Sequence, residues 1–173
     1  MFSFILLREP YYSWIDFGAP NTAAMSNPSD LIYIPSQNYG GWWTEYVTGW
    51  RWGSGQTEYS AGSKIAITDT GTSCVYGPSG IMNHIRDTAE AAITGWTIDN
   101  CNWGKLFSCD EMDNMPDFDI LFGNYWMKVF AEDYVVPVNR SGTCSICLFG
   151  NDNNYWLLGA SFLRGWYSIH DHA

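Results

Sequence analysis

The clearest chemical feature of the sequence is Asp69, which follows an alternating apolar stretch at 64–68 and precedes Thr70, Gly71 and Thr72. Gly71 lets the backbone turn tightly, while hydroxyl and amide groups of such a loop donate hydrogen bonds that orient a carboxylate. A carboxylate displayed in this way suits general acid and base chemistry. An Asp-Thr-Gly tripeptide also occurs as a plain turn closed by an Asx-type hydrogen bond, so the tripeptide alone leaves both interpretations open.

Other residues that bind metals or transfer protons form weaker patterns. His84 falls in a helical pattern with no second His or Cys at metal-ligand spacing, so we interpret it as a solvated or capped side chain. His170-Asp171-His172 could chelate a metal, but we favour a terminal strand there. The acidic cluster at 110–119 lacks the spacing and glycine of an EF-hand, which favours a solvated loop over a calcium site. We therefore predict no metal site and no cofactor.

The elements that must position Asp69 are mostly strands. Eight segments are rich in β-branched and aromatic residues and are bounded by Gly, Pro, Asn or Ser. They are residues 2–7, 13–17, 31–34, 42–47, 64–68, 118–122, 126–130 and 156–158. Gly123-Asn124 predicts a hairpin turn, and apolar spacing after Pro78 predicts one helix over about 79–94. The expected fold is mostly β with one main helix.

Length and charge restrict the class of protein. The chain has 173 residues, which predicts one domain over 1–173. Its net charge of −10 disfavours nucleic acid and anionic membranes as partners. The longest apolar run, at 2–7, is far shorter than the roughly 18 residues of a membrane span.

The cysteines and the N-terminus bear on the compartment. Five cysteines permit at most two disulfides, and Asn139-Arg140-Ser141 is a candidate glycosylation site, which supports a secretory route. The first seven residues lack a basic leader and a cleavage site, so we interpret them as a strand. Either the chain begins here, or upstream sequence with any signal peptide has been lost.

Three ordered segments carry a family resemblance. Residues 65–73, then Gly77-Pro78 and the predicted helix, resemble the second active-site segment of the pepsin-like aspartic peptidases. Trp156-Leu-Leu-Gly159 and residues 161–171 resemble the closing segment that packs under the catalytic loop, and residues 2–18 are similar to the opening strands. The resemblance implies the C-terminal lobe of a bilobal enzyme, with its β-barrel fold. It implies Asp69 as a catalytic acid and Thr70, Gly71 and Thr72 as its supports.

The third segment implies a disulfide. Cys109 followed by Met115-Pro116-Asp117 and a strand is similar to the family pattern, which implies a bond from Cys109 to Cys144. Closing a loop of that length contributes about 3–4 kcal/mol in the chain-entropy model. A second bridge from Cys101 to Cys147 is our guess, with Cys74 as the odd thiol.

The same resemblance implies a missing half. Family members have two lobes that each supply one Asp, whereas this sequence holds a single Asp-Thr-Gly. The chemistry needs two carboxyl groups around a bound water, so we expect the isolated chain to be inactive without an N-terminal lobe. Peptide or protein substrates would lie extended in the cleft, with Ile81, Ile120 and nearby aromatic residues as candidate pocket walls.

Two alternatives remain open at this point. The chain could be a catalytically silent binding or structural module whose cleft face a partner covers, because a bare apolar face is rare on a monomer. A homodimer that brings together two copies of Asp69 is the other. For the enzyme, an acidic location is expected: lysosome, vacuole or secretion into an acidic space.

Overall fold

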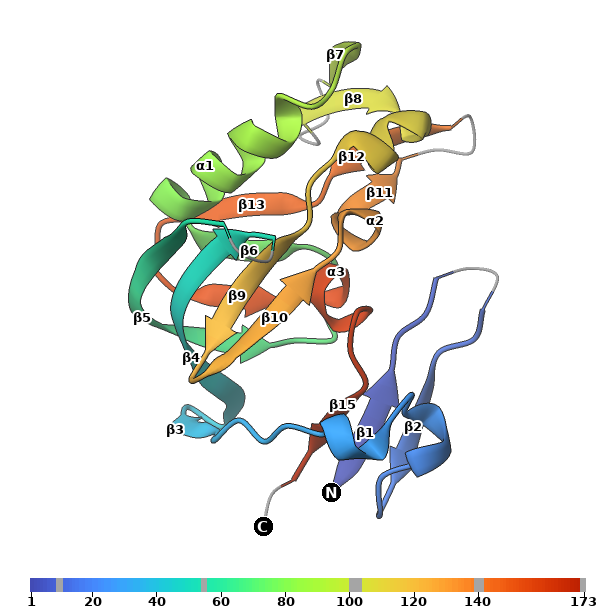
Figure 1. The fold of residues 1–173 in the computed structure, drawn as a ribbon, viewed down its shortest axis with the longest axis vertical. Coiled ribbons are helices and arrows are strands. Elements are labelled where there is room, and N and C mark those ends of the chain that lie inside the picture. The colour runs from blue at the N-terminus through green and yellow to red at the C-terminus, as the bar shows by residue number, and fades with distance from the viewer. Residues whose placement is uncertain (9–10, 54–55, 100–103, 139–141, 172–173) are drawn as a thin grey trace.

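The computed structural model describes residues 1–8, 11–53, 56–99, 104–138 and 142–171. Within these ranges the strands form three sheets, and one helix is much longer than the others (Figure 1). The prediction of a mostly β fold with one main helix is confirmed. None of the described helices has the length and apolar character needed to cross a membrane.

The largest sheet supports the Asp69 loop. Its order is β10-β9-β4-β5-β14-β6-β13, with β3 added beside β4. Its strands are β3 (Gln37–Tyr39), β4 (Trp42–Trp52), β5 (Glu58–Thr68), β6 (Val75–Pro78), β9 (Phe118–Phe122), β10 (Tyr125–Val129), β13 (Leu148–Asn151) and β14 (Trp156–Leu158). β14 runs parallel to β5 and antiparallel to β6, and β6 runs parallel to β13. The carboxyl-terminal ends of β5 and β14 therefore lie side by side.

The β9–β10 hairpin follows the predicted pattern. Phe118, Ile120 and Phe122 are all buried, and β10 returns antiparallel with Tyr125 opposite Phe122. Gly123 has a φ of 58°, which the tight turn requires and which glycine adopts without a steric penalty. The predicted hairpin is confirmed.

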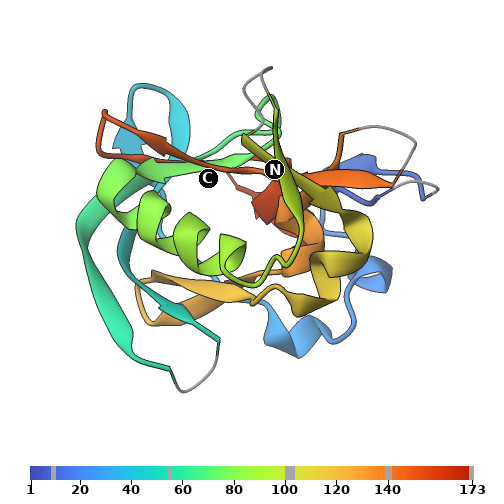
Figure 2. The same ribbon diagram turned by 90° about the horizontal axis from the view of Figure 1, so that it is seen from above.

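Helix α1 (Ser79–Glu90) buries Met82, Ile85 and Ala89 and packs against β6 and β13. Figure 2 shows it lying along the sheet that contains these strands. The helix ends four residues before the predicted Thr94. Amide groups of Ala92 and Ile93 donate to the carbonyl groups three residues earlier, at Ala89 and Glu90, which replaces the helical spacing with tight turns.

Two smaller sheets flank this body. One has the order β11-β12-β8-β7 and the other β15-β1-β2. Their strands are β7 (Trp96–Asp99), β8 (Gly104–Ser108), β11 (Val135–Pro137) and β12 (Thr143–Ile146), then β1 (Phe2–Ile5), β2 (Trp14–Phe17) and β15 (Ser168–His170). The short helices are η1 (Thr22–Ala24), η2 (Pro28–Asp30), η3 (Cys109–Asn114), α2 (Ala131–Tyr134) and α3 (Ala160–Leu163).

The sheet β15-β1-β2 joins the two ends of the described chain. Phe2 lies opposite His170 in the register of β1 and β15, and both termini lie at the same end of the molecule (Figure 1). The predicted strand at 31–34 is wrong. This segment has no partner strand and runs as extended chain between η2 and β3, with Tyr33 largely exposed.

Two disulfides link the described residues. Cys109 is bonded to Cys144, as the family resemblance implies. The guess of a Cys101–Cys147 bridge is wrong, because Cys147 is bonded to Cys74. β6 and β13 pair from Val75 and Leu148 onward, which places the preceding residues side by side, with their Cα atoms 4.8 Å apart. Cys101 lies outside the described residues.

Candidate active site

Asp69 is the first residue after β5 and lies where the parallel strands β5 and β14 both end. Its amide group donates to the Leu158 carbonyl oxygen at 3.1 Å, and its own carbonyl oxygen accepts from the Thr72 amide at 3.2 Å. The first bond fixes Asp69 to the neighbouring strand, and the second closes the turn that follows. The backbone therefore places the acid at the end of a rigid sheet.

The carboxyl group of Asp69 is held by its own loop. Its Oδ1 accepts from the Gly71 amide at 2.9 Å, and its Oδ2 accepts from the Thr72 hydroxyl at 2.7 Å. Two donors, one on each oxygen, fix the plane of the group while other lone pairs stay available. Thr70 is exposed and makes no side-chain hydrogen bond to the described residues. Two of the three predicted supports thus meet the carboxylate.

Gly159 allows the closing segment to pass directly beneath this loop. A Cβ added there would lie 2.4 Å from the Thr72 carbonyl oxygen and 2.5 Å from that of Cys74. The amides of Gly159, Ala160 and Ser161 donate to the carbonyls of Cys74, Thr72 and Ser73 at 2.8–3.1 Å. The loop is thus anchored through its backbone, and the disulfide at Cys74 adds a covalent tie.

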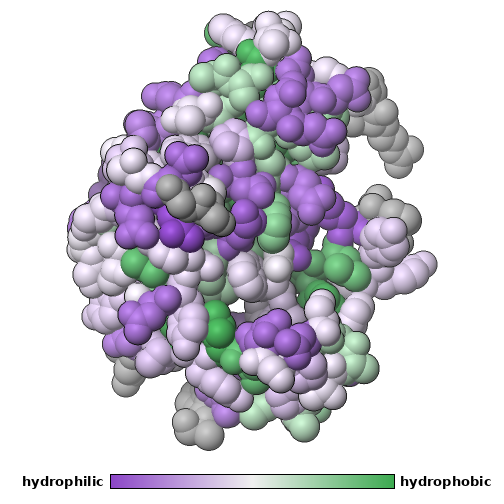
Figure 3. Space-filling view, viewed as in Figure 1, coloured by the Kyte–Doolittle hydropathy of each residue, from purple (hydrophilic) through white to green (hydrophobic). Residues whose placement is uncertain are grey.

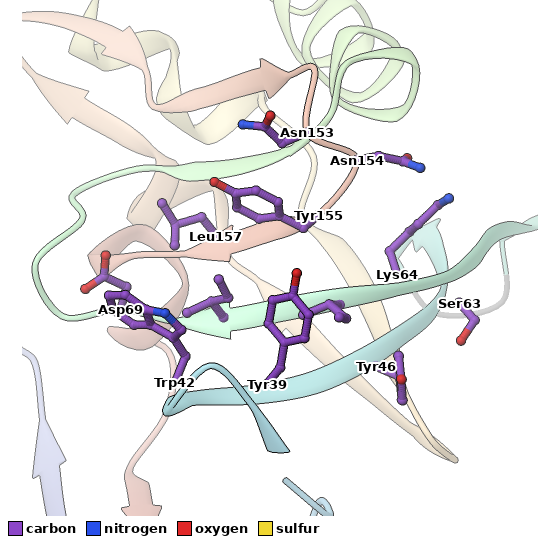
Figure 4. A pocket seen from close by; sticks show the side chains of 12 residues that line it. Tyr39, Trp42, Tyr46, Ser63, Lys64, Asp69, Asn153, Asn154, Tyr155 and Leu157 are labelled. Carbon is purple, nitrogen blue, oxygen red and sulfur yellow. The ribbon is translucent and has the colours of Figure 1, made fainter. Parts of the chain in front are cut away.

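A cavity of about 630 Å³ opens beside Asp69 (Figure 4). Its aliphatic wall comes from Ile65, Ile67 and Leu157 of the paired strands β5 and β14. Aromatic and polar side chains complete the lining: Tyr39, Trp42, Tyr46, Tyr155, Ser63, Lys64, Asn153 and Asn154. An apolar floor with a few polar groups is typical of a site that binds a flexible organic ligand.

Ile81 and Ile120, which were named as candidate pocket walls, do not line this cavity, whereas aromatic residues do. Ile120 is fully buried in the core, and Ile81 packs against the core outside the cavity lining. The true lining comes from segments 39–46, 63–69 and 153–157. Strand alternation could have identified Ile65 and Ile67, because they lie on the same face of β5 as Asp69. The residues of β3 and of the turn before β14 carried no such signal.

One acid of the sheet sits in an unusual environment. Glu45 of β4 lies opposite Ala66 of β5, and side-chain alternation directs it away from the cavity that Tyr46 lines. Its Oε2 is buried and has no hydrogen-bond partner within the part of the chain that the structure describes. Burial raises the pKa of Glu45 to about 7. The carboxyl group is therefore held largely protonated in acid.

The other sequence candidates lie away from the cavity. His84 is exposed on α1 and packs its ring against Trp50 and Tyr59. His170 is buried and stacks on Phe2 and Phe4, and burial lowers its pKa. Among the residues that the structure describes, no group of three His, Cys, Asp or Glu side chains is placed to hold a metal ion. Asn139, the candidate glycosylation site, and His172 lie outside those residues.

Comparisons with known proteins agree with this geometry. The family model for eukaryotic aspartyl proteases matches residues 1–173. The chain belongs to the eukaryotic aspartyl protease family. Embryonic pepsinogen of Gallus gallus is 30% identical over the whole chain, and napsin-A of Homo sapiens is 29% identical over 99% of it. Cathepsin D of Canis lupus familiaris is 25% identical over 99% of the chain.

The matched region is only part of each relative. It covers 42% of embryonic pepsinogen, 41% of napsin-A and 42% of cathepsin D. The chain therefore spans about two-fifths of the length of these eukaryotic aspartyl proteases.

Proposed function

We propose that this chain is the C-terminal lobe of a bilobal aspartic endopeptidase and that Asp69 is its share of the catalytic dyad. The observation that carries the proposal is the Asp69 carboxyl group, oriented by Gly71 and Thr72 at the rim of a large, mainly apolar cavity. The matched length, about two-fifths of the relatives, supports a second lobe that supplies the other acid.

The two carboxyl groups would share one proton and hold a water molecule between them. One carboxylate takes a proton from the water as the water oxygen attacks the carbonyl carbon of the peptide. The other carboxyl group donates its proton to the carbonyl oxygen. The tetrahedral intermediate then loses its C–N bond: the departing amine takes a proton from the dyad, and one hydroxyl group of the intermediate returns a proton to the dyad as it becomes the carbonyl of the new carboxyl group. Thr70, which is exposed beside Asp69, would bond across to the other lobe.

A shared proton requires acid conditions, which fits a lysosomal, vacuolar or acidic extracellular location. The net charge of −10 supports this, because protonation of carboxylates in acid relieves self-repulsion in an acidic protein.

The test is peptide cleavage by the full-length protein that contains this chain together with a first lobe. We expect cleavage in acid, inhibition by a statine peptide, and a loss of kcat of about a thousandfold or more in Asp69→Asn, since one of two reacting groups is removed. Asp87→Asn is the matched control, because it makes the same change at an exposed position on α1. Activity that survives Asp69→Asn contradicts the proposal.

A silent binding module is the second candidate, favoured by the exposed apolar residues Ile15 and Phe17 of β2, which are 51% and 79% exposed. Such a module would bind a partner through this face without cleaving peptides. The absence of cleavage by the full-length protein, together with isolation of a stable complex, would favour this candidate. Sedimentation that shows an active dimer of this chain would instead favour two copies of Asp69.

A further inference from the structure

The cavity beside Asp69 has a polar end with unusual backbone geometry. Among the described residues, Ser63 and Asn154 are the non-glycine residues with left-handed backbone, at φ values of 49° and 60°. Both line this cavity. A left-handed conformation costs residues with a Cβ about 1–2 kcal/mol and concentrates at ligand sites. The turn that carries Asn154 is braced by Asn151, which donates to the Tyr155 carbonyl oxygen and accepts from the Asn153 amide.

Ser63 lies in a bulge of β5, where this strand carries extra residues relative to β4. Lys64 lies opposite Val47 and Ser60 lies opposite Gly49, so three residues of β5 face Thr48 alone. In a regular strand, consecutive side chains point to opposite faces. Here Ser63, Lys64 and Ile65 all line the same cavity. Lys64 is the first residue after this bulge, and its side chain reaches the end of the cavity remote from Asp69 (Figure 4).

Among the residues that the structure describes, no acid forms an ion pair with Lys64. Ion pairs among the described residues hold Arg8, Arg51, Arg86, Lys105 and Lys128, and none of them involves Lys64. Besides Lys64 and Asp69, every side chain that lines the cavity is neutral. Figure 4 shows Lys64 and Asn154 at the end of the cavity remote from Asp69. In a chain of net charge −10, a half-buried cation without a counter-ion is conspicuous.

This end of the cavity matches one chemical class of side chain. An ammonium group with an amide side chain toward the same end, as Lys64 and Asn154 lie in Figure 4, favours a carboxylate, which accepts charge-assisted hydrogen bonds from both. It disfavours a Lys or Arg side chain, which would face a like charge. Lys64 is five residues from Asp69 along β5, so an extended peptide lying on the sheet would span about 16 Å at roughly 3.3 Å per residue. That corresponds to a substrate residue about three to five positions from the reacting bond.

We propose that Lys64, with Asn154, selects an acidic side chain about three to five residues to one side of the scissile peptide bond. This inference rests on the proposed function, because it assumes that peptides lie along β5 past Asp69. It adds a substrate preference that the aliphatic wall of Ile65, Ile67 and Leu157 does not provide.

The test uses the full-length protein and a peptide in which Glu, Gln or Lys is placed in turn at each of six positions on either side of one cleavable bond. A second set carries a non-cleavable reduced bond, so that affinity is measured separately from cleavage. We expect Glu to exceed Gln in kcat/KM and affinity at one position or two adjacent ones, by about two- to fivefold, as expected of a partly exposed ion pair. The preference should fade as the pH falls below about 4.3, where the Glu of the peptide becomes protonated.

The variants distinguish this site from a general charge effect. Lys64→Gln should remove the preference for Glu, and Lys64→Glu should transfer it to Lys at the same position. Lys105→Gln is the matched control, because it changes net charge equally on β8 and leaves Glu90 paired with Arg86. Equal values for Glu and Gln at every position, or a preference that survives Lys64→Glu, would overturn the inference. If nothing is cleaved but the non-cleavable peptides still show the Lys64-dependent preference, only the proposed catalytic function fails.

Discussion

Strands β2 and β9 have similar compositions and opposite surroundings. β9 reads Phe-Asp-Ile-Leu-Phe, and four of its five residues are buried between the sheet neighbours and the core. β2 reads Trp-Ile-Asp-Phe, and three of its four residues are exposed. Phe118 of β9 is fully buried, whereas Phe17 of β2 is 79% exposed. The sequence of an apolar strand therefore does not show whether other parts of the chain cover that strand.

The two strands belong to regions that differ in how completely their apolar faces are covered. The large sheet and α1 bury their apolar faces against each other, so the Asp69 loop rests on a complete core. The sheet β15-β1-β2 leaves apolar side chains uncovered, and Figure 3 shows apolar atoms, in green, beside the hollow between this sheet and the body. A lobe that meets a second lobe through its terminal sheet would have this distribution.

The largest loss of stability should come from Phe118→Ala. Phe118 packs against Trp52 and Tyr134, with ring centroids 6.0 Å from each. Removing the ring leaves a cavity in the core and should lower the free energy of unfolding by about 3–5 kcal/mol. Chemical denaturation of the chain measures it. A loss below about 1 kcal/mol would mean that β9 is not part of a close-packed core.

Gly159→Ala should cause the next largest loss of stability. The added Cβ would meet two backbone carbonyl oxygens at 2.4 and 2.5 Å, and backbone atoms have little freedom to move away. We expect a loss of about 3 kcal/mol, at the upper end of overpacking effects. Gly80→Ala is the control: the added Cβ has no atom within 4 Å and lies in α1, where alanine should stabilise by about 0.5–1 kcal/mol. Equal stability of the two variants would show that the Asp69 loop does not rest on Gly159.

Glu45→Gln tests a carboxyl group whose buried Oε2 has no hydrogen-bond partner among the described residues. The unfolded chain ionises Glu45 near its ordinary pKa of about 4.3, whereas burial in the folded chain raises that pKa to about 7. The contribution of Glu45 to stability should thus be fully present below about pH 4.3 and should fall as the pH rises to about 7. Glu45→Gln should lack this fall, making it more stable than wild type at pH 8 by about 2–3 kcal/mol and nearly equal to it at pH 4.

Denaturation curves from pH 4 to 8 measure this difference. His170 acts in the opposite direction, because burial lowers its pKa and disfavours folding in acid, so only the comparison of variant with wild type isolates Glu45. Glu58→Gln, at an exposed carboxyl group of β5, is the control and should leave the pH dependence unchanged. A parallel pair of curves for wild type and Glu45→Gln would show that Glu45 is solvated.

The sequence predicted those parts of the fold whose signal is local. The β9–β10 hairpin follows from alternation and Gly123, and α1 follows from apolar spacing after Pro78. β6 and β13 escaped prediction, because Val-Tyr-Gly-Pro and Leu-Phe-Gly-Asn are short and have no alternation. The Cys74–Cys147 pair escaped with them, since only the parallel register of these strands brings the two cysteines together.

The candidate site likewise combines local features, which the sequence predicted, with contacts between distant segments, which it did not. Asp69, Gly71 and Thr72 interact within four residues of sequence, so the motif predicted their grouping. The cavity brings together Trp42, Lys64 and Tyr155 from separate strands, and no local pattern gives their distance. The bulge that precedes Lys64 depends on the register of β4 against β5, which the sequence does not display.

The smallest effect on stability should come from Phe17→Ala, which makes in β2 the change that Phe118→Ala makes in β9. Because Phe17 is already 79% exposed, the free energy of unfolding of the isolated chain should change by less than about 0.5 kcal/mol. Association should change instead: sedimentation velocity at micromolar concentration should show weaker self-association, and the first lobe should bind Phe17→Ala less tightly than wild type. A stability loss near that of Phe118→Ala would mean that this chain itself covers β2. A wild-type chain that stays monomeric, soluble and without a partner would remove the argument for a covering lobe, because its bare apolar face would then carry no measurable cost.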